Sequence, residues 1–166
     1  MPTMKFQNLK IASVMMGMGV VLFGVQGCGS TAQEMRLALK GTNRLNLTES
    51  GQPAPTSVRI YTLRESQRFQ KATYKDLKDK DTAELGDDLI HRDELTVQPE
   101  ESQQFEVIVD REKEEKFIGI MVLFRQYPKG VWRLTIPVEE KGVFSIGAQK
   151  FTFELTDHTI RQIEPD

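Results

Sequence analysis

The stretch that decides the fold reads Phe117-Ile118-Gly119-Ile120-Met121-Val122-Leu123-Phe124, eight residues without a polar side chain. Successive side chains of a strand point to opposite faces of a sheet, so a strand that is apolar throughout must be covered on both faces. We therefore expect residues 117–124 to form a central strand. One face would pack on a second sheet, and the other face would need a separate cover.

Residues 65–90 are expected to supply that cover, because the hydrophobic period changes there. Phe69, Ala72 and Leu77 recur at helical spacing, and Ser66 is suited to cap a first helix. Residues 81–85, which precede Gly86, are expected to open a second short turn. The sequence thus predicts a helical insert near residues 65–90 that lies over the outer face of the central strand.

Short alternating stretches predict the remaining strands. They cover residues 35–40, 57–63, 93–97, 104–109, 132–138, 151–155 and 159–163. Turn residues separate them at 127–130 and at Gly142, and the charged run 110–116 is expected to form an exposed hairpin tip. This pattern predicts an all-β fold with a small helical insert, in which two antiparallel sheets form a β-sandwich.

A long loop is predicted between the first two strands. Residues 41–56 contain two glycines, two asparagines and two prolines, a composition typical of loops. Loops of this length on a rigid scaffold are common places for recognition. Leu45 and Leu47 are apolar in this setting, and the sequence leaves open whether they join the core or face a partner.

Composition excludes several classes of function. The chain has 166 residues, a formal net charge of −2 and one cysteine. A nucleic-acid-binding domain would need excess positive charge, so no nucleic-acid partner is expected. One cysteine rules out a disulfide within the chain and a cysteine-rich zinc site.

The cysteine stands at the end of an export-like segment. Lys5 and Lys10 precede an apolar run over residues 11–25, whose helix would span about 22 Å, less than the roughly 30 Å of a bilayer core. The run ends Val25-Gln26-Gly27-Cys28, which resembles a bacterial lipobox. We expect a signal peptide over residues 1–27, a lipidated tether over 28–34 and the β-sandwich domain over 35–166.

Covalent lipid on Cys28 is therefore expected, and no other cofactor is. Because Gly29 and not Asp follows Cys28, the predicted location is the outer membrane, with the domain in the periplasm. The alternative is an uncleaved anchor helix with an inert thiol.

No catalytic or metal-binding pattern stands out, so no enzyme is predicted. A G-x-S-x-G motif is absent, and His91 and His158 lie outside any hydrolase pattern. If residues 87–94 were helical, Asp87 or Asp88 would share a face with His91, but a solvated acidic patch is the favoured interpretation. Trp132 is expected in the core, with sugar stacking as the alternative.

An ordered series of residues resembles the type VI secretion lipoprotein family TssJ (SciN/VasD). The series runs through Leu45-Asn46, Gly51-Gln52-Pro53-Ala54-Pro55, Val58-Arg59-Ile60-Tyr61-Thr62-Leu63, Phe69, Ala72, Tyr74, Leu77, Leu85-Gly86-Asp87-Asp88-Leu89, Phe124-Arg125 and Trp132-Arg133. The chain departs from the family pattern at Leu47-Thr48, where Pro-Asp is common, and at Glu100, where Gly is usual.

The resemblance implies a transthyretin-like β-sandwich that is not an enzyme. It implies an outer-membrane-anchored assembly subunit that binds the periplasmic domain of the inner-membrane protein TssM and reaches TssL indirectly. The family's recognition loop lies between the first two strands and maps here to residues 43–56. The partner-contacting residues are then expected to be Leu45, Asn46, Leu47, Thr48, Glu49 and Gln52. The alternative functions are a periplasmic lipoprotein that binds a small ligand or carbohydrate, and an envelope enzyme.

Overall fold

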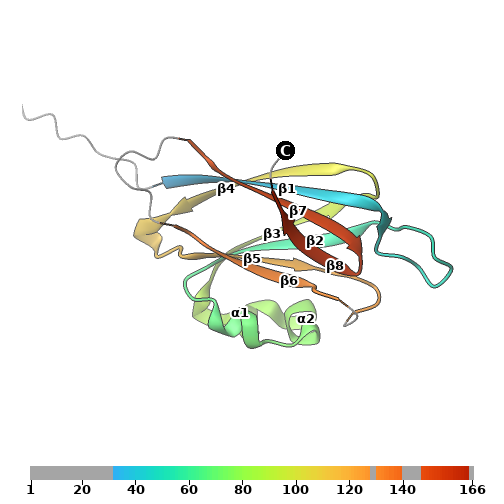
Figure 1. Ribbon diagram of the computed structural model, residues 1–166. Helices are drawn as coiled ribbons and strands as arrows, with labels where there is room; N and C mark the ends of the chain where they lie inside the picture. The colour runs from blue at the N-terminus through green and yellow to red at the C-terminus, as the bar shows by residue number, and fades with distance from the viewer. Residues whose placement is uncertain (1–31, 128–129, 140–146, 165–166) are drawn as a thin grey trace, which may run out of the picture.

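Two four-stranded sheets form a β-sandwich with a helical insert (Figure 1). The computed structural model describes residues 32–127, 130–139 and 147–164. The first sheet has the order β4 (Ser102–Asp110), β1 (Ala32–Leu45), β7 (Gln149–Asp157), β8 (Thr159–Ile163). The second has the order β3 (Leu89–Val97), β2 (Thr56–Leu63), β5 (Phe117–Val122), β6 (Arg133–Pro137). The predicted all-β sandwich with a small helical insert is confirmed.

Two connections differ from the expected antiparallel hairpins. Strand β7 pairs with β1 in parallel, because the chain reaches β7 from β6 in the other sheet. The charged run 110–116, with the short 3₁₀ turn η2 (Arg111–Lys113), joins β4 of the first sheet to β5 of the second. The prediction of a hairpin tip is therefore wrong, and Glu115 in this crossing is buried. The turn expected at Gly142 lies outside the described residues.

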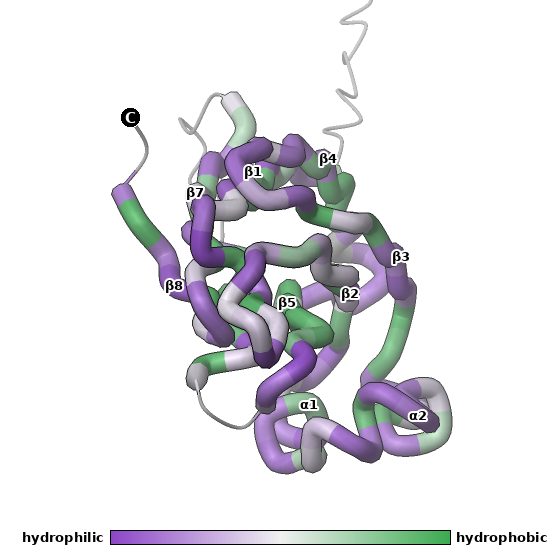
Figure 2. The backbone as a smooth tube through the Cα atoms, turned by 90° about the vertical axis from the view of Figure 1, so that its right-hand side faces the viewer, coloured by the Kyte–Doolittle hydropathy of each residue, from purple (hydrophilic) through white to green (hydrophobic). Residues whose placement is uncertain are grey.

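The main core lies between the two sheets. Strand β1 contributes Met35, Leu37 and Leu39, and β5 contributes Ile118 and Ile120, all buried. Figure 2 shows this apolar interior as green segments of neighbouring strands within a mostly purple and white tube. The alternation predicted for β1 places its side chains inward, and in the wholly apolar β5 every second side chain faces this core.

The helical insert covers the outer face of the second sheet, as predicted. Helices α1 (Gln67–Lys71) and α2 (Tyr74–Leu85), followed by the 3₁₀ turn η1 (Gly86–Asp88), pack on β2 and β5. Phe69 and Leu77 are buried against Tyr61 and Met121. A Cβ atom at Gly119 would lie 3.0 Å from the Phe69 ring, so the insert approaches the central strand closely at this glycine.

The helix ends differ in detail from the prediction. Ser66 precedes α1 but makes no side-chain capping bond, whereas Thr73 caps α2 by accepting a hydrogen bond from the Asp76 N–H (3.1 Å). Lys80 has non-helical backbone angles and divides α2 into two pieces. The second short turn that the sequence predicts over residues 81–85 is the piece after this kink.

The buried carboxylate of Asp81 fixes the kinked helix to the sheet. Its Oδ2 accepts hydrogen bonds from Arg92 Nη1 (2.9 Å), the Tyr61 hydroxyl (3.0 Å) and Arg59 Nη1 (3.2 Å). Burial alone would raise the pKa of Asp81, but the bonds from Arg92, Tyr61 and the Thr82 N–H outweigh it and hold the pKa below its usual value. Side chains of β2 and β3 therefore donate to one carboxylate of α2.

Replacing Asp81 should loosen this insert. Asp81→Asn removes the carboxylate that Arg92 contacts and one of the two that Arg59 contacts, the other being Glu94 (2.9 Å), so we expect a loss of about 2–3 kcal/mol in the free energy of unfolding. A depressed folded-state pKa stabilises the protein above the unfolded pKa of about 3.9, and that stability is lost as the pH falls through the folded pKa. Urea unfolding should therefore show a weaker loss of stability below about pH 4 in Asp81→Asn than in wild type.

Asp79→Asn is the matched control, because Asp79 forms an exposed pair with Lys75 (2.8 Å) on the same helix. Its expected change is within about 0.5 kcal/mol. Equal effects of the two substitutions would contradict the role given to Asp81.

Candidate partner-binding site

The loop between β1 and β2 is shorter than the sequence predicts. Strand β1 runs on to Leu45, so the loop comprises residues 46–55, which we call the β1–β2 loop. Gly41 is the reason for the difference. Its N–H donates to the Glu101 carbonyl (2.8 Å), and a Cβ atom there would lie 2.4 Å from the Gln98 carbonyl oxygen. Gly41 therefore permits close approach within a strand, with a register shift after it, and does not start a turn.

The β1–β2 loop projects beyond the sheets at the end opposite the start of β1 (Figure 1). Strand β1 has 14 residues, which at about 3.3 Å per residue place the loop about 45 Å from Ala32. The last three residues of the predicted tether, 32–34, belong to this strand. The segment that leads from the predicted attachment point thus enters one end of the domain, and the loop leaves the other.

Asn46 holds the base of the loop. Its Nδ2 donates to the Pro55 carbonyl (2.8 Å), its Oδ1 accepts from the Arg125 N–H (2.8 Å) and its own N–H donates to the Asp157 carbonyl (2.7 Å). Its φ of 48° lies in the left-handed region, which asparagine tolerates better than most residues. One side chain and its backbone thus connect both ends of the loop to both sheets.

The tip of the loop is a tight turn with its own hydrogen bonds. The Gly51 N–H donates to the Thr48 carbonyl (3.0 Å), and the Thr48 N–H donates to the Gln52 carbonyl (2.8 Å). Thr48 Oγ1 lies 2.9 Å from the Ser50 hydroxyl and accepts from the Gln52 N–H (3.1 Å). Gly51 has a φ of 78°, which a residue with a side chain adopts only under strain. The tip is therefore ordered without help from a partner.

The six predicted contact residues separate into two groups. Leu45 is fully buried and Asn46 is 2% exposed, so the expectation that their side chains face a partner is wrong. Both are used inside, Leu45 in the core and Asn46 at the loop base. Leu47 and Thr48 are half-buried, and Glu49 and Gln52 are exposed. The surface that a partner can reach starts at Leu47.

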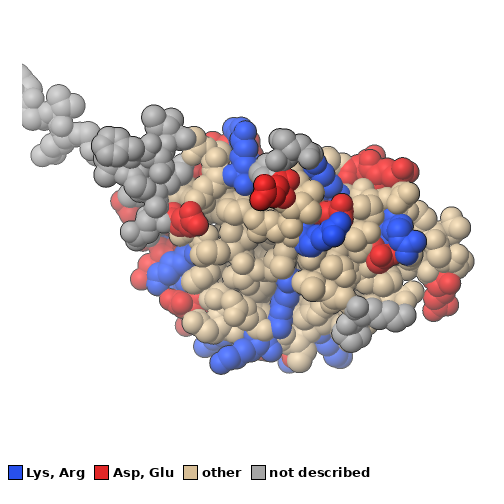
Figure 3. All heavy atoms as spheres, in the orientation of Figure 1, with Lys and Arg blue, Asp and Glu red and all other residues tan. Residues whose placement is uncertain are grey.

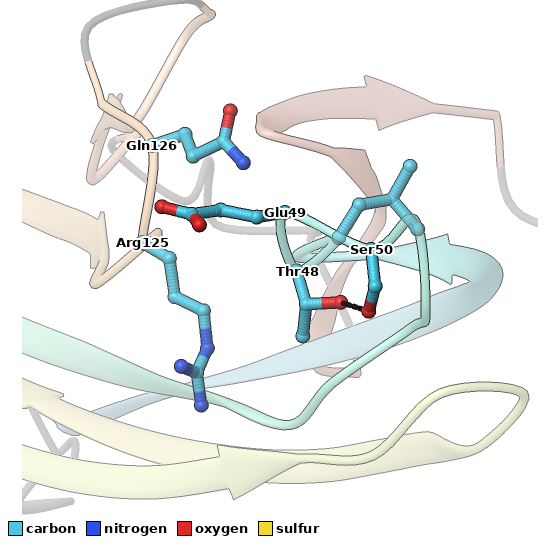
Figure 4. A pocket seen from close by; sticks show the side chains of 6 residues that line it. Thr48, Glu49, Ser50, Arg125 and Gln126 are labelled. Carbon is cyan, nitrogen blue, oxygen red and sulfur yellow. Dashed lines mark hydrogen bonds between the residues drawn. The ribbon is translucent and has the colours of Figure 1, made fainter.

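A hollow of about 490 Å³ lies between the loop and the segment after β5. Leu47, Thr48, Glu49 and Ser50 form one wall, and Arg125 and Gln126 form the other. Figure 4 shows Glu49 and Arg125 extending from opposite walls. The walls therefore carry an acidic group, a basic group and an apolar leucine, a combination suited to binding a protein.

Sequence reasoning did not assign Arg125 and Gln126 to this site. Arg125 follows Phe124 in the motif that carries the family resemblance. It lies far from the β1–β2 loop along the chain, so the sequence does not indicate that the two are close in space. The bond from the Arg125 N–H to Asn46 Oδ1 is what brings the two walls together. On the face shown in Figure 3, basic and acidic side chains are interspersed, so that face carries no continuous field of one sign.

The other candidates do not assemble a site. Asp87 and Asp88 lie in η1, whereas His91 lies on β3 with its Nε2 3.1 Å from Asp93 Oδ2, so the helical spacing considered for a metal does not apply. The described residues contain no group of three potential ligands able to hold a metal ion. Trp132 is half-buried, in edge contact with the Tyr74 ring (5.1 Å) and beneath the Arg133 guanidinium. Cys28 lies outside the described residues.

Comparisons with known proteins identify the fold. The chain matches the family described as "Type VI secretion lipoprotein, VasD, EvfM, TssJ" over residues 33–158. Similar solved structures include the T6SS lipoprotein TssJ1 from Pseudomonas aeruginosa (24% identity, 81% of this chain and 98% of that chain, TM-score 0.72). Serratia marcescens Lip, a membrane-bound component of the type VI secretion system, is also similar (18%, 82% and 100%, TM-score 0.74).

A third similar chain comes from the structure described as "T6SS protein TssM C-terminal domain (869-1107) from EAEC" (22% identity, 80% of this chain and 99% of that chain, TM-score 0.65). A comparison with curated proteins gave no match.

The fold and the family match define a structural lipoprotein of a secretion apparatus, not an enzyme. The chain belongs to the type VI secretion lipoprotein family that includes TssJ and VasD. Within the described residues, no helix is long and apolar enough to span a membrane.

Substitutions at Asn46 should separate its hydrogen bonds from its backbone conformation. Asn46→Ala removes both side-chain bonds and puts alanine, which tolerates the left-handed region less well than asparagine, at positive φ, so we expect a loss of about 2–4 kcal/mol in unfolding free energy. Asn46→Gly removes the same bonds without the backbone strain and should lose about 1 kcal/mol less. Chemical denaturation gives the order, and an alanine variant as stable as wild type would contradict the assignment.

Proposed function

We propose that the chain is an outer-membrane-anchored assembly subunit of the type VI secretion membrane complex. Its β1–β2 loop binds the periplasmic domain of a TssM-type inner-membrane protein, and it reaches a TssL-type protein indirectly. The observation that carries the proposal is the ordered loop that projects from the end of the domain opposite the start of β1. Family membership supports the assembly role.

Cys28 provides the membrane attachment in this proposal. Acyl chains stabilise membrane binding by about 0.8 kcal/mol per buried CH₂, so several chains on one cysteine hold a domain far more firmly than a single chain does. Three residues separate Cys28 from Ala32, where β1 begins. A short link of this kind keeps the near end of the sandwich close to the bilayer and directs the loop toward the periplasm.

Leu47, Thr48, Glu49 and Gln52 form the contact surface, together with Arg125 and Gln126 across the hollow. Leu47 supplies apolar area, and Glu49 and Arg125 supply charges of opposite sign that select and orient a partner. The match to a chain in the structure named for a TssM domain supports this choice of partner. Four fifths of this 166-residue chain cover 99% of the matched chain. The matched chain is therefore too short to be the TssM range 869–1107, and it accompanies that domain in the structure.

The interior of the protein offers little to the alternative of small-ligand binding. The space between the second sheet and the insert is filled by Phe69, Leu77 and Leu85, all fully buried. The hollow beside the β1–β2 loop is open at the surface, as Figure 4 shows for its two separated walls. Filled interiors and ordered protruding loops favour a protein partner over a small molecule.

Deleting residues 49–52 should abolish binding to a TssM-type periplasmic domain. The deletion removes the exposed tip but leaves Asn46 and its bonds in place, so the unfolding midpoint should stay close to that of wild type. The point variant Glu49→Lys should weaken binding about tenfold, equivalent to about 1.4 kcal/mol.

Glu112→Lys serves as the charge-matched control, because Glu112 is exposed in η2 and away from the loop. Affinity is measured by titration of the purified partner domain onto the full-length lipoprotein. Undiminished binding by the deletion variant would refute the loop assignment and leave the family role intact.

Lipid attachment is tested separately at Cys28. Cys28→Ser removes the thiol that the acyl chain needs, so the variant should take up no labelled palmitate and should leave the outer-membrane fraction. The readouts are palmitate labelling in growing cells and density-gradient fractionation of their membranes. Equal labelling of wild type and variant would contradict the proposed lipid anchor at Cys28.

A further inference from the structure

The two open sides of the sandwich are built differently. On one side, the Ile160 N–H of β8 donates to the carbonyl of Val131, two residues before β6 begins (2.8 Å), so the two sheet edges are joined. On the other side, the edge strands β3 and β4, nine residues each, flank a surface hollow of about 340 Å³. Figure 2 shows β3 and β4 together on the side opposite β8.

Strand β4 lacks the features that usually protect a sheet edge. Proteins blunt such edges with proline, lysine, clustered charges or bulges. Strand β6 ends in Pro137, and β3 carries four ionisable side chains in a row, at residues 91–94. Strand β4 has neither proline nor lysine, and its ladder with β1 runs without a shift from Ala32↔Asp110 to Lys40↔Ser102. Its outer edge is therefore a regular template for another strand.

Ile108 marks this edge as apolar. Its side chain is 71% exposed, more than any other large hydrophobic side chain of the described residues. Ile108 and Glu106 are two residues apart on β4, so they share one face of the strand. On this face, an added strand would meet the acidic Glu106 and the apolar Ile108 at successive positions.

The charges around the hollow select the partner's chemistry. Asp93, Glu106 and Glu115 contribute carboxylates, and Glu115 also accepts a hydrogen bond from the Asp110 N–H. The facing cationic groups are Arg36, with Nε 3.2 Å from Glu106, and His91, with Nε2 3.1 Å from Asp93. Three carboxylates thus face one arginine and one histidine, so this edge favours a basic side chain from a partner.

We propose that β4 binds a partner protein by strand addition, and that the added strand carries a basic and an apolar side chain two residues apart on one face, opposite Glu106 and Ile108. Main-chain hydrogen bonds along β4 provide the affinity, while Ile108 and the carboxylates select the side chains of the added strand that face them. A second copy of this chain is the competing occupant of this edge, and dimerisation through β4 without peptide would reveal it. This surface is separate from the β1–β2 loop and does not depend on its proposed partner.

The probe is a nine-residue peptide in which every second residue is lysine and valine in turn, with threonine between them, so that one face presents both; it is titrated onto the full-length protein in detergent. We expect saturable binding and slower amide hydrogen exchange along Ser102–Asp110. A peptide with glutamate in place of lysine should bind at least tenfold more weakly. Equal binding of the two peptides, or protection elsewhere and not on β4, would overturn the proposal.

Two substitutions on β4 give the matched comparison. Ile108→Lys removes apolar area and adds a positive charge that repels the lysines of the peptide, and Glu106→Gln removes one carboxylate. Each substitution should weaken binding of the lysine peptide several-fold or more. Val131→Lys is the control, because Val131 is 49% exposed on the joined side of the sandwich and should leave binding unchanged. A loss at Val131 equal to that at Ile108, or dimerisation through β4 without peptide, would count against strand addition.

Discussion

The hydrogen bonds of Asn46 are the constraint on which the presentation of the β1–β2 loop depends. Through them the end of β1, the start of β2, the segment after β5 and the β7–β8 turn meet at one residue. Because these elements belong to both sheets, the loop cannot move independently of the sandwich. A preorganised loop loses little conformational freedom on binding, so more of its contact energy appears as affinity.

The remaining structure stiffens the body behind that loop. The central strand β5 is covered on one face by the first sheet and on the other by the helical insert, which Asp81 fixes to β2 and β3. In the proposed function, this body separates the lipid anchor from the protein contact by the length of β1, about 45 Å.

Most of the architecture could be predicted from the sequence, because hydrophobic period and turn chemistry are local. The apolar run at 117–124 indicated a doubly covered strand, and the period change after Leu63 indicated the insert. The sequence could not show that Gly41 lets the Gln98 carbonyl approach the backbone within a strand. Nor could it show that the Asn46 side chain is buried, where its hydrogen bonds hold the base of the loop. It also could not bring Arg125 beside Glu49, since that proximity depends on long-range pairing. Contact residues inferred from loop position alone therefore included two that belong to the interior.

Amide hydrogen exchange of the full-length lipoprotein, with and without a TssM-type periplasmic domain, tests the central claim most directly. The account predicts that exchange slows at residues 47–52 and at Arg125 and Gln126, while the helical insert and β8 stay unchanged. Slower exchange confined to the insert or to β8, with residues 47–52 unaffected, would contradict it.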